Sequence, residues 1–226
     1  MSRVNTDTVS IAVLAKAPIP GRVKTRLAML LGSEGAATLH ARLVAHTVET
    51  AVAAATGPVT LWATDERDAL FRDLAQRFSL TVARQPEGDL GVRMHAAFAQ
   101  ANAPTLVIGS DCAALTPAHL RDAAEVLRGG SDVVVCPAED GGYVLIGLMR
   151  PVPELFSGMT WSTDTVMVET RNRLRHLGLS WREPIQLWDV DRPTDVRRMR
   201  REGMTELLAG IDKRTASSEW GMGNGE

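Results

Sequence analysis

Basic side chains gather in one short segment near the N-terminus, at Lys16, Arg22, Lys24 and Arg26. The segment follows an apolar run over residues 9–15, which predicts a buried strand, and it precedes an Ala- and Leu-rich stretch typical of a helix. Cations at the N-terminus of a helix oppose the helix dipole, so four of them together are poorly explained as solvated surface charge. With a sharp turn at Gly21, they predict a loop that binds the phosphates of an anionic ligand.

This basic loop differs from a P-loop, the most familiar phosphate-binding motif. Lys24-Thr25 resembles the end of that motif, but Val23 stands where the motif requires glycine. Pro18 and Pro20 stiffen the approach to the turn, which lowers the entropy lost when a binding loop becomes ordered. A solvated, positively charged helix start remains the simpler alternative for any single one of the cations.

Carboxylates follow two of the expected strands. Asp111 comes directly after an apolar run over residues 105–108, and Asp189 and Asp191 come after a strand-like piece over residues 185–188. Ligands of open α/β sheets bind outside the carboxyl ends of the strands, so these side chains should face the basic loop. Asp111 with Asp191 or Asp189 could then hold a divalent metal, because Mg²⁺ is commonly bound by one or two carboxylates plus substrate phosphates. The alternatives are a turn at Asp111 and a helix cap at Asp191.

Three further loops combine glycine or aromatic residues with polar ones and are candidate contacts to the same ligand. They contain Gly88, Asp89 and Arg93; Asp140, Gly141 and Gly142; and Trp161 and Ser162. Glycine lets a backbone approach a ligand closely. Ordinary turns explain the first two loops equally well, and a helix cap at Ser162 or Thr163 explains the third.

Strand-like and helix-like patterns alternate along the chain. The expected strands cover residues 9–15, 58–63, 80–83, 105–108, 132–136, 143–148 and 185–188. The expected helices cover residues 28–55 with a break near Gly32-Ser33, 66–78, 92–101, 117–128, 163–177 and 193–208 with an interruption at Gly203. This alternation predicts a mostly parallel sheet with helices on both faces, in which the strand over residues 143–148 runs antiparallel. No linker divides the chain, so we expect one domain over residues 1–211 and a frayed tail over residues 212–226.

The composition is that of an ordinary globular protein. The chain has 226 residues, 45% hydrophobic and 23% charged, and a formal net charge of −2, which gives no global argument for binding nucleic acid. No apolar run approaches the roughly 20 residues of a membrane span, and the N-terminus lacks the apolar core of a signal peptide. The cysteines, Cys112 and Cys136, do not suggest a disulfide scaffold. We therefore expect a cytoplasmic protein that binds small molecules, with neither nucleic acid nor a membrane as partner.

Taken together, these motifs resemble the GT-A-fold nucleotide-diphospho-sugar transferase superfamily. Within it, the chain is similar to the bacterial glycosyltransferase-like family described as radical-SAM/selenodomain-associated transferase 1. The matching segments span nearly all of the expected core and occur in the same order. They are residues 15–18, 21–27, 88–94, 108–112, 140–148, 161–163 and 189–195.

The resemblance implies a single-domain, three-layer α/β/α GT-A fold whose N-terminal half binds a nucleotide. It also implies that Asp111 binds Mg²⁺ or Mn²⁺, with Asp191 preferred to Asp189 as the second ligand. Two guanylyltransferases, those for 2-phospholactate and for the molybdenum cofactor, look like more distant relatives. The chain departs from the family pattern at Ala113, where proline usually follows the Asp-Cys pair. We expect this change to loosen the turn after Asp111 and to leave its carboxylate in place.

The sequence therefore predicts a metal-dependent transferase that uses a nucleotide-activated substrate and a small-molecule acceptor. In the first version it transfers a sugar from a nucleotide-sugar, as the family name suggests. In the second it is a nucleotidyltransferase that joins a nucleoside triphosphate to an acceptor and releases pyrophosphate, which the charge of the basic loop favours. Lys24 and Asp111 are the expected catalytic residues in both. A protein that binds a nucleotide or nucleotide-sugar without catalysis is the alternative from another class.

Overall fold

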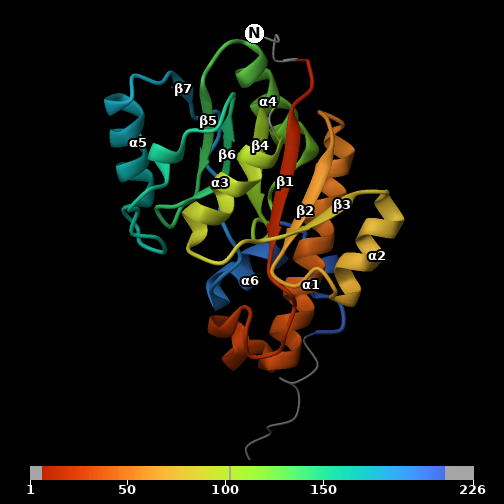
Figure 1. Cartoon of the computed structure of the whole chain (residues 1–226). Coiled ribbons are helices and arrows are strands. Elements are labelled where there is room, and N and C mark those ends of the chain that lie inside the picture. Colours follow the sequence, from red (N-terminus) through yellow and green to blue (C-terminus); the bar gives the residue numbers. More distant parts are fainter. Residues whose placement is uncertain (1–6, 102, 212–226) are drawn as a thin grey trace, which may run out of the picture.

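A seven-stranded sheet runs through the centre of the structure, a computed structural model in which residues 7–101 and 103–211 are described (Figure 1). The strands lie in the order β3-β2-β1-β4-β6-β5-β7. Neighbouring strands are parallel except where β6 pairs with β4 and β5. Their bounds are β1 (Ser10–Ala15), β2 (Val59–Ala63), β3 (Thr81–Arg84), β4 (Thr105–Gly109), β5 (Val133–Pro137), β6 (Tyr143–Leu148) and β7 (Trp181–Arg182).

Helices cover both faces of this sheet and form the outer two of three layers (Figure 1). One face is covered by α1 (Ala28–Ala54), α2 (Ala69–Phe78) and α4 (Pro117–Arg128), which share an apolar cluster with the sheet. The other face is covered by α3 (Leu90–Ala101) and α5 (Val166–His176), which share a second cluster. The expected α/β fold with a mostly parallel sheet and one antiparallel strand is confirmed.

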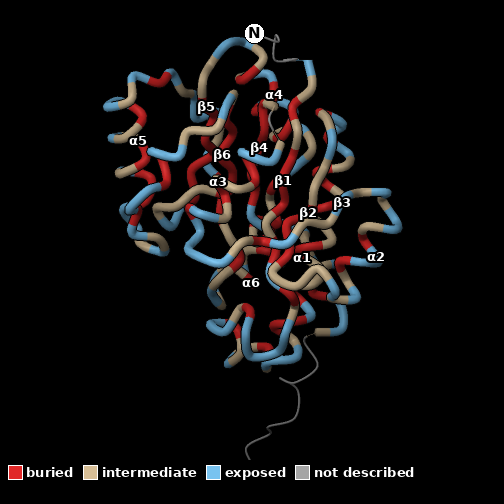
Figure 2. The backbone as a smooth tube through the Cα atoms, viewed as in Figure 1, coloured by how far each residue is buried: buried red, intermediate tan, exposed pale blue. Residues whose placement is uncertain are grey.

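Side-chain alternation along the strands produces these two clusters. In β1, Ile11 and Val13 belong to the first cluster and Ala12 to the second, since successive residues of a strand point to opposite faces. Both faces of the central strands are therefore buried, and Figure 2 shows this as buried backbone through the middle of the molecule. Strands buried on both faces read as continuous apolar runs in the sequence, as is typical of parallel sheets.

A third apolar cluster lies beyond the carboxyl ends of β1 and β4. It joins the start of α1 to α6 (Pro193–Arg201) and to the 3-10 helix Thr205–Leu208. Trp188 and Val190 belong to this cluster, as do Leu27 and Leu39. The packing therefore holds the chain around residues 188–190 against the segment that follows the basic loop.

Most of the expected elements are observed within two or three residues. The break expected in the first helix is a kink at Gly32, whose φ of 70° and ψ of 165° are not helical. Thr116 is the N-cap of α4, where its side chain accepts a hydrogen bond from the His119 backbone nitrogen. The helix expected over residues 193–208 is indeed divided, into α6 and the 3-10 helix that follows. The tail expected over residues 212–226 lies outside the described residues.

Four local interpretations are wrong: those of one strand, of the start of one helix and of two helix caps. Residues 185–188 form no strand and contribute one isolated bridge, Leu187 to Ala138, because β7 occupies the edge beside β5 and Pro184 follows it. The fifth helix begins at Val166 rather than at residue 163, since the left-handed φ of 64° at Ser162 is incompatible with a helix start there. Neither Ser162 nor Thr163 is its cap.

The helix cap that the sequence offered as the alternative role of Asp191 is also absent. Asp195 instead accepts hydrogen bonds from the backbone nitrogens of Asp191 and Arg192, at 3.0 and 2.6 Å, and so caps α6 from within its first turn. The Asp191 side chain is thereby left available for other contacts.

Among the described helices, none combines the length and the apolar character that a membrane crossing requires.

Gly147 in β6 provides a test of the central packing. A Cβ at this position would lie 2.5 Å from Leu106 Cδ2 and 2.6 Å from Val134 Cγ1, both in the buried core. We expect Gly147→Ala to lower the free energy of unfolding by about 1–3 kcal/mol, because the close-packed core must shift. Urea denaturation measures this change. Gly109→Ala is the matched control, since a Cβ there meets no atom within 4 Å, and an equal loss in the control would contradict the packing argument.

Candidate functional site

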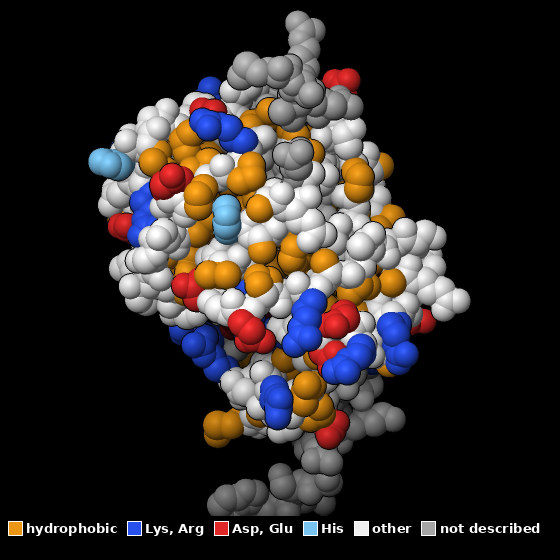
Figure 3. Space-filling view, viewed as in Figure 1, with side chains coloured by type: hydrophobic (Ala, Val, Ile, Leu, Met, Phe, Trp, Pro, Cys, Tyr) orange, Lys and Arg blue, Asp and Glu red, His pale blue; other side chains and the backbone are white. Residues whose placement is uncertain are grey.

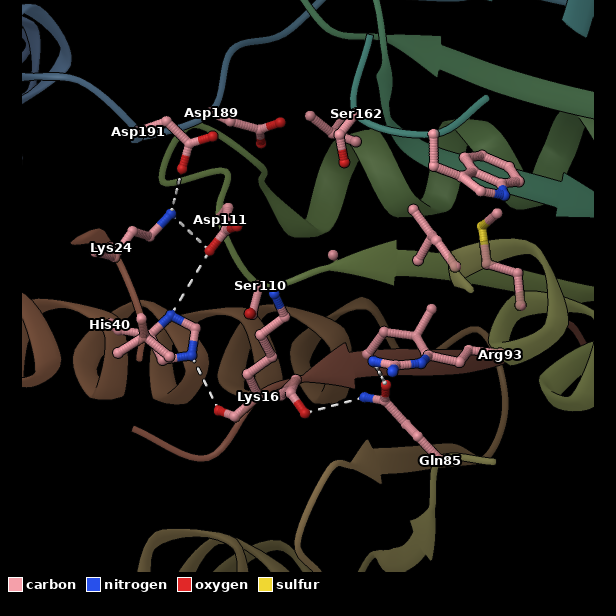
Figure 4. Close-up of a pocket in the computed structure, with 18 of the residues that line it drawn as sticks. Lys16, Lys24, His40, Gln85, Arg93, Ser110, Asp111, Ser162, Asp189 and Asp191 are labelled. Atoms are coloured by element: carbon pink, nitrogen blue, oxygen red, sulfur yellow. Dashed lines mark hydrogen bonds and ion pairs between the residues drawn. The ribbon is translucent and has the colours of Figure 1, made fainter. Parts of the chain in front are cut away.

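A cavity of about 740 Å³ opens at the carboxyl ends of β1 and β4 (Figure 4). This is the edge of the sheet at which open α/β proteins bind ligands. Many of the residues expected from the sequence line it. They are Lys16, Arg22, Lys24, Arg26, Gly88, Asp89, Arg93, Asp111, Trp161, Ser162, Asp189 and Asp191.

Lys24 joins two of the predicted metal ligands. Its Nζ lies 2.7 Å from Asp111 Oδ1 and 2.9 Å from Asp191 Oδ1, with both carboxylates pointing toward it (Figure 4). The Lys24 side chain is only 3% exposed, whereas the side chains of Asp111 and Asp191 are 41% and 38% exposed. The three residues come from the loop after β1, the end of β4 and the segment before α6.

These contacts shift the protonation equilibria of the pair. Burial by itself would lower the pKa of Lys24, but the charges of Asp111 and Asp191 outweigh it and raise that pKa. Burial would likewise raise the pKa of Asp111, but Lys24 and His40 lower it well below the ordinary range. Lys24 and Asp111 are therefore both charged at neutral pH.

Asp189 is placed differently from its neighbours. Burial, together with the negative charges of Asp111 and Asp191, raises the pKa of Asp189 to about 8. Lys24 pairs with Asp111 and Asp191, and Asp189 adds a third carboxyl group close enough to feel their charges. The site carries more negative charge than Lys24 alone can balance.

The backbone of the basic loop directs Lys24 inward. Val23 and Leu27 are buried on either side of it, and they hold the loop on the core. Lys24 itself has a left-handed backbone, with a φ of 47° and a ψ of 39°, a conformation that is uncommon for a residue with a side chain. The loop is further fixed by a hydrogen bond from the Ala17 backbone nitrogen to Thr64 Oγ1 at 2.9 Å.

The remaining cations of the loop lie at the rim of the cavity. Lys16, Arg22 and Arg26 are exposed, and none forms an ion pair with a carboxylate in the described part of the chain. Figure 3 shows several Lys and Arg side chains, with Asp and Glu among them, on the lower part of the face in view. These rim cations are available for an anionic ligand.

His40 is a site residue that the sequence analysis missed. It lies on the buried side of α1, where Nε2 is 3.0 Å from the Lys16 carbonyl oxygen and Nδ1 is 3.7 Å from Asp111 Oδ1. His40 therefore links the basic loop to the carboxylate at the end of β4 (Figure 4). A single histidine among the apolar residues of a helix gave no signal in the sequence that distinguishes this role from ordinary burial.

Gln85, at the end of β3, is a second site residue that was not singled out. Its Nε2 donates hydrogen bonds to the carbonyl oxygens of Ala15 and Trp62, at 3.0 and 2.7 Å, and so ties the ends of β1 and β2. Its Oε1 accepts a hydrogen bond of 3.2 Å from Arg93 Nη1. Arg93 also donates from Nε to the Gly88 carbonyl oxygen, so its guanidinium group is held at the cavity wall (Figure 4).

Other expected site residues have roles beside the cavity. Gly21, with a φ of 76°, forms the turn of the basic loop but does not line the cavity. Asp140, Gly141 and Gly142 form a turn outside the lining, in which the Gly141 backbone packs directly against the Asp164 carbonyl group. The structure places these residues around the cavity rather than in its wall.

The cavity and its sheet define a GT-A-like transferase fold, and solved structures support this class. A candidate nucleotide-diphospho-sugar transferase from Desulfovibrio desulfuricans G20 is 26% identical, with a TM-score of 0.76 over 88% of this chain and 93% of that one. A nucleotidyl transferase from Methanothermobacter is 15% identical, with a TM-score of 0.63 over 88% and 99%. Rv0371c of Mycobacterium tuberculosis H37Rv, solved with manganese, is 21% identical, with a TM-score of 0.52 over 85% and 98%.

The chain belongs to the bacterial family DUF2064, whose model matches residues 47–163 and is described as an uncharacterized protein conserved in bacteria. No curated protein matches the chain. The expected class, a transferase related to the nucleotide-diphospho-sugar transferases, is confirmed. The matched region contains Asp111 and Arg93, whereas the basic loop and Asp191 lie outside it.

The raised pKa of Asp189 predicts a pH-dependent stability in metal-free buffer. Between the ordinary pKa of 3.8 and about 8, the folded protein holds a proton that the unfolded chain has lost, so this group makes stability fall as pH rises. We expect Asp189→Asn to raise the free energy of unfolding at pH 8 by on the order of 1 kcal/mol or more. Near pH 4 the gain should vanish.

Urea denaturation at both pH values measures the effect. Asp122→Asn, at an exposed position of α4, is the control and should show no such difference. A gain of the same size at pH 4 and pH 8 would contradict an origin in the Asp189 charge.

Proposed function

We propose that this chain is a divalent-metal-dependent transferase that transfers a sugar from a nucleotide-sugar to a small-molecule acceptor. One observation carries the proposal: the rim cations and the carboxylates Asp111 and Asp191 line the same cavity. Cations alone would suit any anion. Cations facing carboxylates across one cavity suit a nucleotide whose phosphates are shared with a divalent metal.

The basic loop would bind the phosphates. Lys16, Arg22 and Arg26 lie at the rim without carboxylate partners in the described chain, so they can offset the charge that develops on a leaving diphosphate. Because they come from one loop held on the core by Val23 and Leu27, they are positioned before the substrate arrives. Arg93, oriented by Gln85, adds a further cation to the lining of the cavity.

The carboxylates fit a divalent cation by charge and by donor type. Two carboxylates, Asp111 and Asp191, pair with one ammonium group, and burial together with their negative charges raises the pKa of the neighbouring Asp189. Carboxylate oxygens are the ligands that Mg²⁺ and Mn²⁺ prefer. The described residues contain no set of three or more acidic, His or Cys side chains arranged around one ion, so Asp111 and Asp191 would share the metal with substrate phosphates. The metal would supply charge stabilisation for the leaving group.

The second candidate function is nucleotidyl transfer with release of pyrophosphate. The observation that favours it is the number of rim cations, since a triphosphate brings more negative charge than a nucleotide-sugar. The site residues would have the same roles. The protein would then join a nucleoside triphosphate to a phosphorylated or hydroxylated acceptor.

The released phosphate species distinguishes the two candidates. After a thermal-shift screen with Mn²⁺ has selected a nucleotide or nucleotide-sugar, we expect ³¹P NMR to show release of a nucleoside diphosphate from a nucleotide-sugar. Pyrophosphate released from a triphosphate would support the second candidate instead. Binding with no release in the presence of any acceptor tested would indicate a protein that binds nucleotides without catalysis.

Asp111→Asn tests the metal-dependent step. The substitution removes one negative charge at the expected metal ligand, and we expect Mn²⁺-dependent turnover to fall by at least about 100-fold. Asp122→Asn, at an exposed position of α4, should keep full turnover. An unchanged Mn²⁺ dependence of turnover in Asp111→Asn would show that Asp111 does not bind the metal.

A further inference from the structure

Lys24 occupies the position between the two carboxylates that the proposed function assigns to the metal. Its Nζ lies 2.7 and 2.9 Å from Asp111 Oδ1 and Asp191 Oδ1. With a side chain only 3% exposed, Lys24 is a buried counterion of these two groups rather than a free phosphate ligand. It differs in this from the exposed cations of the same loop, Arg22 and Arg26.

A metal bound by the same oxygen would come close to the ammonium group. Mg²⁺ or Mn²⁺ lies about 2.1 Å from a carboxylate ligand, so an ion on Asp111 Oδ1 would be no more than about 5 Å from Nζ. Two cations this close repel strongly in a half-buried site, where solvent screens them poorly. Metal binding and the present position of Lys24 are therefore opposed.

A bound phosphate would give the Lys24 ammonium group a second anionic partner. The backbone of Lys24 is held by the buried neighbours Val23 and Leu27, but its four-carbon side chain can rotate about its own bonds. Arg22, Arg26 and Lys24 line one cavity, and a phosphate bound by the arginines would offer Nζ an anionic partner. A rotation of the Lys24 side chain would then exchange a carboxylate partner for a phosphate.

We propose that Lys24 is an internal cation that blocks the metal position in the nucleotide-free protein and releases it when nucleotide phosphates bind. The inference rests on the proposed function and adds a coupling to it. Since each ligand favours the arrangement that the other requires, nucleotide and metal bind with positive cooperativity. The two carboxylates then bind metal tightly only in the presence of substrate.

The block of the metal position by Lys24 can be tested by measuring Mn²⁺ affinity in the absence of nucleotide. Electron paramagnetic resonance of the free ion gives this affinity. We expect Lys24→Met to bind Mn²⁺ at least tenfold more tightly than the unchanged protein, because the competing ammonium group is gone. Arg26→Met is the matched control. It removes a cation of the same loop that makes no ion pair with the described carboxylates, and it should change the affinity less than threefold.

The outcomes separate the inference from the function on which it rests. Equal Mn²⁺ affinity in Lys24→Met and the unchanged protein would overturn the internal-cation role and leave the metal-dependent function standing. Equal tightening in Arg26→Met would also overturn it, since general electrostatics would then explain the effect. No Mn²⁺ binding by any of these proteins, with or without GTP, CTP or UDP-glucose, would overturn both.

A second measurement uses the unchanged protein, so it tests the inference even if Lys24→Met fails to fold. Amine acylation followed by mass spectrometry compares Lys24 with the exposed Lys16. We expect saturating Mn²⁺ to increase modification of Lys24 several-fold and to leave Lys16 unchanged, because the displaced ammonium group becomes accessible. Unchanged protection of Lys24 at saturating Mn²⁺ would overturn the inference.

Discussion

The ion pairs of Lys24 with Asp111 and Asp191 hold together three segments that are far apart in the sequence. They link the loop after β1, the end of β4 and the chain that enters α6. A half-buried cluster of like charges is unstable unless a counter-charge lies within it. Lys24 supplies that counter-charge.

Apolar packing makes this electrostatic arrangement possible. The cluster that joins α1, α6 and the segment around Trp188 fixes the backbone next to Asp189 and Asp191. Val23 and Leu27 fix the other side, at the basic loop. Both supports are buried, so they fix the backbone segments that the ion pairs link. The charged groups of the site thus rest on a buried apolar base.

Much of the architecture could be predicted because it depends on short-range patterns. Buried parallel strands appear as continuous apolar runs, and Thr116 with Pro117 marks a helix start by local capping chemistry. The strand expected over residues 185–188 failed for the opposite reason. Its apolar residues, Leu187 and Trp188, are buried by packing against helices and by a single bridge rather than by a ladder of strand pairs. The spacing of apolar residues in the sequence is the same for both kinds of burial, so it does not distinguish them.

The sequence by itself determined which chemical groups this protein carries and at which edge of the sheet they would meet. For the basic loop and Asp111 the order of strands and loops is enough, because parallel strands end on the same side, whereas the strand expected before Asp189 and Asp191 is not formed. Only the tertiary structure decided how the groups pair. It placed Lys24 inside the carboxylate cluster and left Arg22 and Arg26 at the rim, although the three are neighbours in one loop. It also brought in His40 from a helix, since burial and contact depend on chain segments that are remote in the sequence.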